Sequence, residues 1–125
     1  MVPNRRPEPG DIYWIDDLPP LEGGAPTRRP VVVVEQWEDE IVVAVGVTTE
    51  LLAPDRIELP NRVTEPGTTT NLPRPCAVIP RWIVRISASR FMPESYCGYL
   101  PRVTLEQVLA AVENVLSDWP GPFSE

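Results

Sequence analysis

The feature that most constrains the fold of this chain is a run of four consecutive valines at residues 31–34. A strand with one face in water alternates apolar and polar residues. An unbroken β-branched run therefore predicts a strand buried on both faces, near the centre of a sheet or barrel. Pro30 precedes the run and fits the first position of a strand, where its missing N–H costs no ladder hydrogen bond. Pro30 also favours an extended backbone at Arg29, which predicts that this arginine is fixed beside a rigid strand. The alternative is that Arg28 and Arg29 are only charged residues of a solvent-exposed loop.

Seventeen prolines are spread along the chain and exclude long helices from most of it. A length of 125 residues predicts one domain, residues 1–125, with residues 1–8 and 118–125 as flexible tails. No apolar run is long enough to span a bilayer, and the charged N-terminus lacks the apolar segment of a signal peptide. We therefore expect a cytoplasmic protein without a membrane partner.

The chain contains no histidine, which excludes catalysis by a Ser–His or Cys–His pair and disfavours a zinc site. We expect neither a metal nor another cofactor. Cys76 and Cys97 lack the spacing of a metal or redox motif, so we expect reduced, buried thiols.

Charge restricts the kind of partner that the chain can bind. The net charge is −7, and all eleven basic residues are arginine. An acidic chain does not attract a polyanion over its whole surface. A nucleic-acid site would therefore be a local groove, where the planar fork of arginine suits bidentate contact with phosphate.

Short β-branched and aromatic segments separated by turn residues predict a mainly β fold. The tight acidic connection at residues 38–40 predicts an antiparallel hairpin between residues 31–37 and 41–47. Because a hairpin brings the start of its first strand beside the end of its second, we expect Arg29 and Thr48 to be neighbours. Further strands are predicted at residues 10–16, 56–59 (an edge strand), 76–79 with an irregular continuation over 80–86, and 95–100, with long loops at 17–26 and 61–73.

One helix is predicted near the C-terminus. Thr104 is its expected N-cap, with Gln107 completing a capping box and Val103 and Val108 forming a hydrophobic staple. Residues 118–122 are expected to stop the helix. Apolar residues at a 3.6-residue spacing predict core contact: Leu105, Val108, Leu109, Val112, Val115 and Leu116. Five to seven short strands and this helix predict a small half-open barrel.

Several of these segments together resemble the MazF/PemK (Kid) toxins, small ribonucleases of toxin–antitoxin modules. The resemblance runs from about Arg6 to Leu116 and rests on Gly-Asp-Ile-Tyr-Trp-Ile-Asp at residues 10–16, Arg-Pro-Val-Val-Val-Val at 29–34, the strand into Val47-Thr48, Leu-Pro-Arg-Pro at 72–75 and the terminal helix. It implies an SH3-like barrel, a homodimer, cleavage of single-stranded RNA, typically messenger RNA, and inhibition by a cognate antitoxin protein.

The resemblance also implies catalytic residues. In that family the arginine before the Pro-Val-Val strand and the threonine closing the next strand are the catalytic pair, which corresponds to Arg29 and Thr48. The 2′-hydroxyl of RNA is the nucleophile, so the protein mainly stabilises the charged phosphorane, an effect worth about 10²–10³ in rate per fixed donor. Predicted substrate-binding residues are Arg28, Thr49, Glu50, Arg74 and Arg81, with Arg85 a further candidate for phosphate contact.

The chain departs from the family's pattern at the position of the general base. Some members carry a carboxylate after the strand at residues 76–79, where this chain has Pro-Arg-Trp at 80–82. Glu50 or Asp11 could supply the base, or Arg29 could act alone. The connection at residues 38–40 looks shorter than the family's usual loop, and residues 23–26 lack its usual sequence.

These departures leave a second hypothesis open, a barrel that does not catalyse a reaction. It would be either a CcdB-like gyrase poison or a degenerate, catalytically silent toxin that only binds RNA or an antitoxin. Trp37, Trp82 and Tyr96 could stack on unpaired bases, or pack in the core or at a dimer interface.

Overall fold

The computed structural model describes residues 6–21, 23–38 and 40–117, without the side chains of residues 37 and 38. The predicted tails at residues 1–8 and 118–125 lie outside this part except for residues 6–8, and so does the predicted helix stop at 118–122. The described elements, in chain order, are β1 (Asp11–Leu18), β2 (Thr27–Glu38), β3 (Ile41–Thr48), β4 (Ile57–Leu59), β5 (Cys76–Ser87), the 3-10 helices η1 (Ala88–Arg90) and η2 (Pro93–Ser95), β6 (Tyr96–Tyr99) and α1 (Arg102–Ser117).

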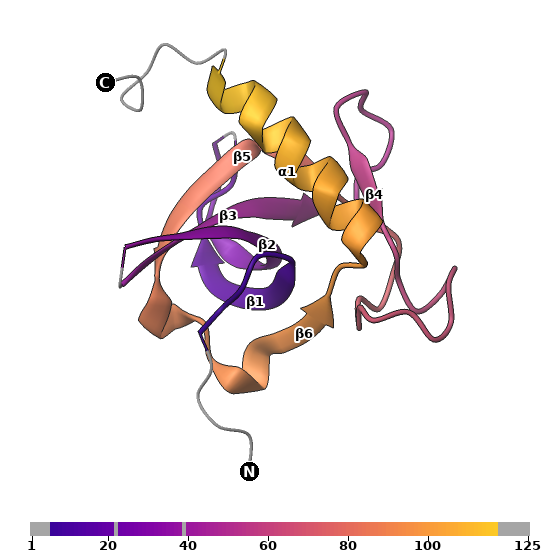
Figure 1. The fold of residues 1–125 in the computed structure, drawn as a ribbon, viewed down its shortest axis with the longest axis horizontal. Coiled ribbons are helices and arrows are strands. Elements are labelled where there is room, and N and C mark those ends of the chain that lie inside the picture. Colours follow the sequence, from indigo (N-terminus) through magenta and orange to yellow (C-terminus); the bar gives the residue numbers. More distant parts are fainter. Residues whose placement is uncertain (1–5, 22, 39, 118–125) are drawn as a thin grey trace.

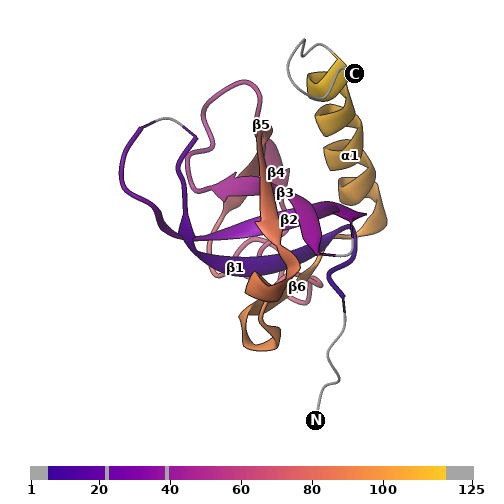
Figure 2. The ribbon, with the colours of Figure 1, turned by 90° about the vertical axis from the view of Figure 1, so that its left-hand side faces the viewer.

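The strands of the described residues form one antiparallel sheet in the order β4-β5-β3-β2-β1-β6. The sheet curls into a half-barrel, and α1 lies across it (Figure 1). Turned by 90°, the molecule shows α1 standing along one side of the curled sheet (Figure 2). The predicted fold class, a mainly β half-open barrel with a C-terminal helix, is confirmed. Among the described residues, no helix combines the length and apolar character that a membrane crossing needs.

The valine run lies at the centre of this sheet, and its side chains alternate between two hydrophobic cores. Val32 and Val34 pack on the side that α1 covers, together with Val108 and Val112 of the helix. Val31 and Val33 pack on the opposite side. Burial of a valine side chain stabilises the fold by about 1.5–3 kcal/mol, so β2 is held from both faces, as the sequence predicted.

The predicted start of this strand is wrong. β2 begins at Thr27, so Arg28 and Arg29 belong to the strand and do not precede it. Pro30 lies opposite Trp14 of β1, while the pairing with β3 begins at Val31. A proline is tolerated at this fourth strand position because the ladder to β3 has not yet begun.

The predicted capping box is also wrong. The helix begins at Arg102, and the carbonyl of Pro101 already accepts the N–H of Leu105 at 2.9 Å. Thr104 therefore lies within the first turn. Val103 is exposed and does not form the predicted hydrophobic staple with Val108. The predicted stripe is confirmed at Val108 and Val112, which are buried, and Leu105 and Leu109 pack beside them, whereas Leu116 is partly exposed.

The loop between β4 and β5 is held against the edge strand β6. Thr70 and Gly98 form an isolated bridge, and the N–H of Asn71 donates to the carbonyl of Cys97 at 2.8 Å. Gly98 has φ +103°, and a Cβ there would lie 2.3 Å from the carbonyl oxygen of Thr69, so only glycine allows this approach. The bridge fixes the segment that follows, residues 72–75, at the mouth of the barrel.

Candidate active site

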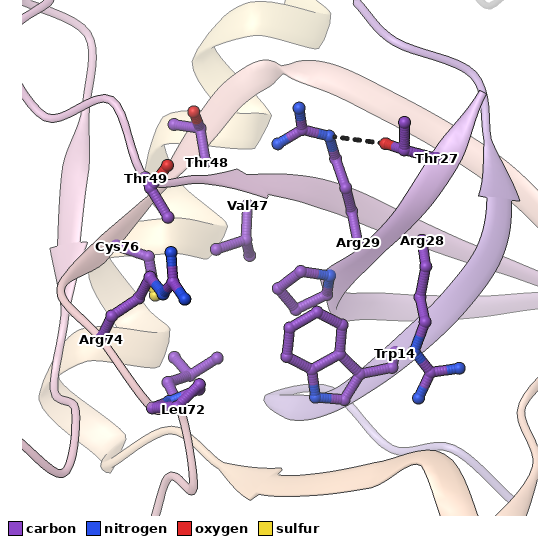
Figure 3. Close-up of a pocket in the computed structure, with 12 residues that line it drawn as sticks. Trp14, Thr27, Arg28, Arg29, Val47, Thr48, Thr49, Leu72, Arg74 and Cys76 are labelled. Carbon is purple, nitrogen blue, oxygen red and sulfur yellow. Dashed lines mark hydrogen bonds between the residues drawn. The ribbon is translucent and has the colours of Figure 1, made fainter. Parts of the chain in front are cut away.

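A pocket of about 350 Å³ opens where β2 begins and β3 ends (Figure 3). The loop that precedes β5 forms its opposite wall. Its lining residues are Trp14, Thr27, Arg28, Arg29, Pro30, Val47, Thr48, Thr49, Leu72, Pro73, Arg74 and Cys76.

The hairpin brings Arg29 and Thr48 to the same end of this pocket. The ladder between β2 and β3 ends at the pair of Val31 and Gly46. Arg29 and Thr48 lie two residues beyond this pair on their strands, and both line the pocket. The predicted proximity is therefore present, while the catalytic roles stay a prediction.

Two neighbours orient the guanidinium of Arg29. Its Nε donates a hydrogen bond to Oγ1 of Thr27 at 3.1 Å. Its central carbon lies 5.7 Å from the ring centroid of Trp82, within the range of a cation–π interaction. Trp82 is buried, and its indole N–H donates to the carbonyl of Pro19 at 3.2 Å. Of the two interpretations of Trp82, packing in the core is therefore the one found here.

A local irregularity in the sheet makes room for Trp82. Val45 pairs with Ile83 and Val47 with Val78, so residues 79–82 of β5 lie opposite Gly46 alone. A Cβ on Gly46 would lie 2.2 Å from the Trp82 ring. The Trp82 ring, which serves as a platform under Arg29, can therefore take this position only because residue 46 of the facing strand is a glycine.

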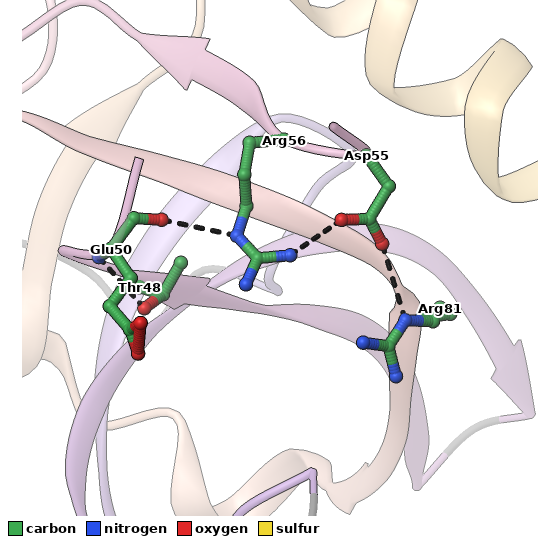
Figure 4. Close-up of polar contacts among 5 residues, drawn as sticks. All are labelled: Thr48, Glu50, Asp55, Arg56 and Arg81. Atoms are coloured by element: carbon green, nitrogen blue, oxygen red, sulfur yellow. Dashed lines mark hydrogen bonds and ion pairs between the residues drawn. The ribbon is translucent and has the colours of Figure 1, made fainter. Parts of the chain in front are cut away.

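Thr48 is held in a short turn. Its side-chain oxygen accepts the N–H of Glu50 at 3.1 Å, which leaves the hydroxyl hydrogen to donate elsewhere. The carbonyl of Glu50 accepts from Nε of Arg56 at 3.1 Å (Figure 4). Asp55 then bridges two arginines, with contacts of 2.6 Å to Arg56 and 3.2 Å to Arg81. This chain of contacts fixes the turn from the side away from the pocket.

The predicted substrate-binding residues divide into two groups. Arg28, Thr49 and Arg74 line the pocket, and Glu50 follows Thr49 outside the lining. Arg81 does not line the pocket, because its guanidinium pairs with Asp55.

The remaining candidates lie elsewhere. Arg85 lines a separate cavity of about 220 Å³ between the sheet and α1. Tyr96 contacts the Tyr13 ring edge-on at 5.4 Å, and the side chain of Trp37 lies outside the described residues. Asp11 is buried at the start of β1, where its carboxylate accepts the N–H of Glu8 at 2.9 Å.

The lining of the pocket has an unusual charge for this protein. Three arginines line it and, in the described part of the chain, no carboxylate does, although acidic residues outnumber basic ones by eighteen to eleven. Arg28 is partly neutralised by Asp16 at 2.9 Å, an exposed pair that is weak in water. A local, arginine-lined pocket is the form that the sequence required of any nucleic-acid site in this acidic protein, and binding of nucleic acid there stays a prediction.

The two cysteines are free and buried, as expected. Burial raises the pKa of the Cys76 thiol to about 11, with the neighbouring Cys97 thiol adding to the shift and Arg74 opposing it. Burial also raises the pKa of Cys97, against a hydrogen bond from the Trp14 side chain. Cys76 therefore lines the pocket as a neutral thiol and is a poor nucleophile. Within the described residues, no group of three or more Cys, Asp or Glu side chains could hold a metal ion.

Comparison with known proteins adds two findings. The sequence profile of the family described as "PemK-like, MazF-like toxin of type II toxin-antitoxin system" matches residues 8–116. A comparison with curated proteins found no matching sequence.

Several solved structures share this fold. MazF from Deinococcus radiodurans is 18% identical and superposes with a TM-score of 0.68 over 91% of this chain and 99% of that one. An endoribonuclease from a mycobacterial species, solved in complex with its cognate antitoxin, is 22% identical, with a TM-score of 0.62 over 91% and 99%. The Mycobacterium tuberculosis toxin MazF-mt6 is 18% identical, with a TM-score of 0.61 over 87% and 99%.

Proposed function

This chain belongs to the family of PemK-like, MazF-like toxins of type II toxin–antitoxin systems, and from that premise we propose that it cleaves single-stranded RNA with Arg29 and Thr48. Toxins of this family are endoribonucleases. The observation that carries the proposal is the arginine-lined pocket of an otherwise acidic protein. Such a pocket attracts one short stretch of phosphodiester backbone and not a nucleic acid in general.

In the proposed reaction the 2′-oxygen of one nucleotide attacks the adjacent phosphorus. The new bond joins phosphorus to the 2′-oxygen while the bond to the 5′-oxygen of the next nucleotide breaks. The products are a 2′,3′-cyclic phosphate and a free 5′-hydroxyl. Arg29 keeps donors beyond the one bonded to Thr27, and these stabilise the charge on the phosphorane. Thr48 donates its free hydroxyl hydrogen to a non-bridging oxygen.

The 2′-hydroxyl must lose its proton, and the 5′-oxygen must gain one. Asp11 lies four residues before Ile15, the partner of Arg29, which is about 13 Å along an extended strand. Glu50 directly follows the Thr48–Thr49 pair and is exposed. We therefore assign proton removal to Glu50, through its carboxylate or a water molecule beside it. The leaving 5′-oxygen takes its proton from water at the open mouth of the pocket, so the protons balance.

The proposal includes two protein partners, a second copy of the chain and a cognate antitoxin. Support comes from the family membership and from the similar endoribonuclease that was solved with its antitoxin. A homodimer predicts a solution mass of twice 14.0 kDa, measurable by light scattering. The mass of one chain would contradict it.

The test is cleavage of single-stranded RNA by purified protein in the presence of EDTA. Arg29→Ala removes the main donor to the phosphorane, so we expect cleavage to fall by about 10²–10³ while the thermal unfolding midpoint stays close to that of the wild type. Arg102→Ala is the matched control, because Arg102 is exposed on α1 and contacts Glu106, far along the chain from the pocket.

Two outcomes would contradict parts of the proposal. Unchanged cleavage by Arg29→Ala would refute the catalytic assignment, and loss of wild-type cleavage in EDTA would refute metal independence. A folded wild-type protein that binds RNA without cutting it would be the non-catalytic barrel of the second hypothesis.

A further inference from the structure

The pocket extends beyond Arg29 and Thr48 into a mainly apolar slot with one arginine at its far side (Figure 3). We call this region the base slot; its walls are Trp14, Pro30, Val47, Leu72, Pro73 and Arg74. We propose that the base slot holds one unpaired guanine of the RNA, stacked against Trp14 and recognised by Arg74. The inference rests on the proposed function, because the nucleotide concerned adjoins the phosphate held by Arg29.

Trp14 offers a fixed aromatic surface. Its side chain is half-buried and packs against the hydrophobic core that contains Cys97. The guanidinium of Arg28 lies 5.5 Å from its ring centroid, so the indole is held from a second direction. An aromatic side chain on which a base stacks contributes about ten-fold or more to single-strand binding.

The volume of the pocket fits a single nucleotide. At about 350 Å³, it lies near the lower end of the range for small-molecule sites. Part of this volume is needed for the phosphate beside Arg29 and Thr48, which leaves room for one base in the base slot. Pro30, Val47 and Leu72 give that base apolar walls.

Arg74 differs from the other arginines of the pocket. Arg28 pairs with Asp16, and Arg29 bonds to Thr27. Arg74 is exposed and, in the part of the chain that the structure describes, makes no hydrogen bond or ion pair. Figure 3 shows its guanidinium reaching into the pocket from the loop that faces Trp14.

The loop that carries Arg74 is held firmly enough to position it. The buried hydroxyl of Thr70 donates to the carbonyl of Pro60 at 2.5 Å. The carbonyl of Leu72 accepts the N–H of Arg62 at 3.0 Å. These bonds fix the backbone on the N-terminal side of Arg74, and β5 begins just after it.

The chemistry of the lining discriminates among the four bases. At the edge where guanine presents O6, adenine and cytosine present an exocyclic amine, which needs an acceptor, and no side chain of the base slot carries one. The amine of guanine itself, N2, lies at a different edge of the base. Guanine presents O6 and N7 side by side, which match the fork of an arginine in two parallel hydrogen bonds. Uracil offers a single carbonyl at the same edge. The expected order of preference is therefore guanine, then uracil, then adenine and cytosine.

The experiment uses the full chain with Arg29→Ala, in which we expect cleavage to be reduced about 10²–10³, and short fluorescent single-stranded RNAs that differ at one central base. We expect about ten-fold tighter binding for guanine than for adenine or cytosine, the discrimination of one bidentate contact. Inosine keeps O6 and N7 and should bind like guanine. The 7-deazaguanine analogue lacks N7 and should lose most of the preference.

Adding Arg74→Lys should abolish the preference, because an ammonium is a point charge without the planar fork. Arg102→Lys in the same background should preserve it. Equal binding of the guanine and adenine RNAs, or a preference that survives Arg74→Lys, would overturn the inference.

Sequencing the ends that wild-type protein produces from random single-stranded RNA separates this inference from the proposed function. Cleavage without a base preference on either side of the cut would refute the inference of a guanine-binding slot but would leave the proposed nuclease function intact. A guanine preference in binding, with no cleavage by the wild type, would leave the base slot and refute the nuclease.

Discussion

Arg29 shows how neighbouring side chains restrain a long, flexible side chain. An arginine loses considerable rotamer freedom when it is fixed. In this protein the aromatic face of Trp82 and the hydroxyl of Thr27 restrain Arg29 before any substrate arrives. In the proposed reaction, a guanidinium that is already oriented leaves less ordering for the moment when charge develops on the phosphorane.

Arg56 should act as a positioning residue for Thr48. It touches the carbonyl of Glu50 and the carboxylate of Asp55 but does not line the pocket. In Arg56→Gln the turn that holds Thr48 loses its outer support, so we expect kcat to fall about ten-fold, the cost of a slightly misplaced group, with KM nearly unchanged. Steady-state kinetics on a short RNA measures both constants.

Arg56→Lys keeps a donor for the Glu50 carbonyl and should restore part of kcat. Arg102→Gln is the matched control on an exposed arginine. A change confined to KM would instead mean that Arg56 binds substrate directly, and an unchanged kcat would remove it from the site.

The sequence predicted that Arg29 and Thr48 lie close together but did not single out Arg56, and the difference is physical. The register of one hairpin determines where Arg29 and Thr48 lie, and a hairpin is a local structure with a recognisable turn. The contacts of Arg56 depend on where the loop between β3 and β4 folds back beside the sheet, and no short-range sequence pattern predicts that position. Arg81 was expected in the pocket for its charge alone, but Asp55 holds its guanidinium outside the lining.

At the scale of elements, the irregular stretch of β5 connects the fold to the site. Four residues opposite Gly46 let the strand bulge and bring the Trp82 ring against the β3 backbone at Gly46. Bulges often re-aim a side chain next to a functional site. Gly46, a glycine within a run of valines, was the available sequence signal for such a close approach.

Replacing Gly46 with alanine should disturb both stability and activity. The new Cβ would lie 2.2 Å from the Trp82 ring, which its hydrogen bond to Pro19 prevents from moving away freely. We expect a loss of about 1–3 kcal/mol in the free energy of unfolding, as for other overpacked cores, and reduced cleavage as Arg29 loses its platform. Denaturant unfolding followed by tryptophan fluorescence measures the stability.

Gly23→Ala is the control for this substitution. Gly23 has no atom within 4 Å of its would-be Cβ, so its free energy of unfolding should change by less than about 0.5 kcal/mol. Equal free energies of unfolding for the two variants would show that the Trp82 ring can move away from the new methyl group without destabilising the fold.

For other elements, the sequence predicted which residues are buried but not where the element begins. The valine run was predictable because both faces of this strand are buried, and the stripe of Val108 and Val112 because one face of the helix is buried. The helix start was not, since Thr104 and Gln107 imitate a capping box inside a helix that begins after Pro101. Hydrogen bonding of the backbone decides such ends, and side-chain patterns only suggest them.

At the scale of the whole molecule, charge favours the pocket as the place for the proposed contact with RNA. A net charge of −7 repels RNA from most of the surface. Of the three arginines that line the pocket, Arg28 and Arg29 are left for phosphates in the proposal that Arg74 recognises a base. Binding of single-stranded RNA should therefore release few counterions, in contrast to proteins with a broad basic face.

This distribution of charge predicts a weak dependence of RNA binding on salt. Two phosphate contacts to a single strand correspond to a slope of about −1.4 for the logarithm of the binding constant against that of the salt concentration. Fluorescence anisotropy of a labelled single-stranded RNA with the Arg29→Lys variant, which keeps the charge, measures this slope, and Arg28→Gln in the same background should bring it to about −0.7. A slope steeper than about −4 would place phosphates on arginines outside the pocket and contradict the local groove. An unchanged slope in Arg28→Gln would show that the Arg28–Asp16 pair stays closed when RNA binds.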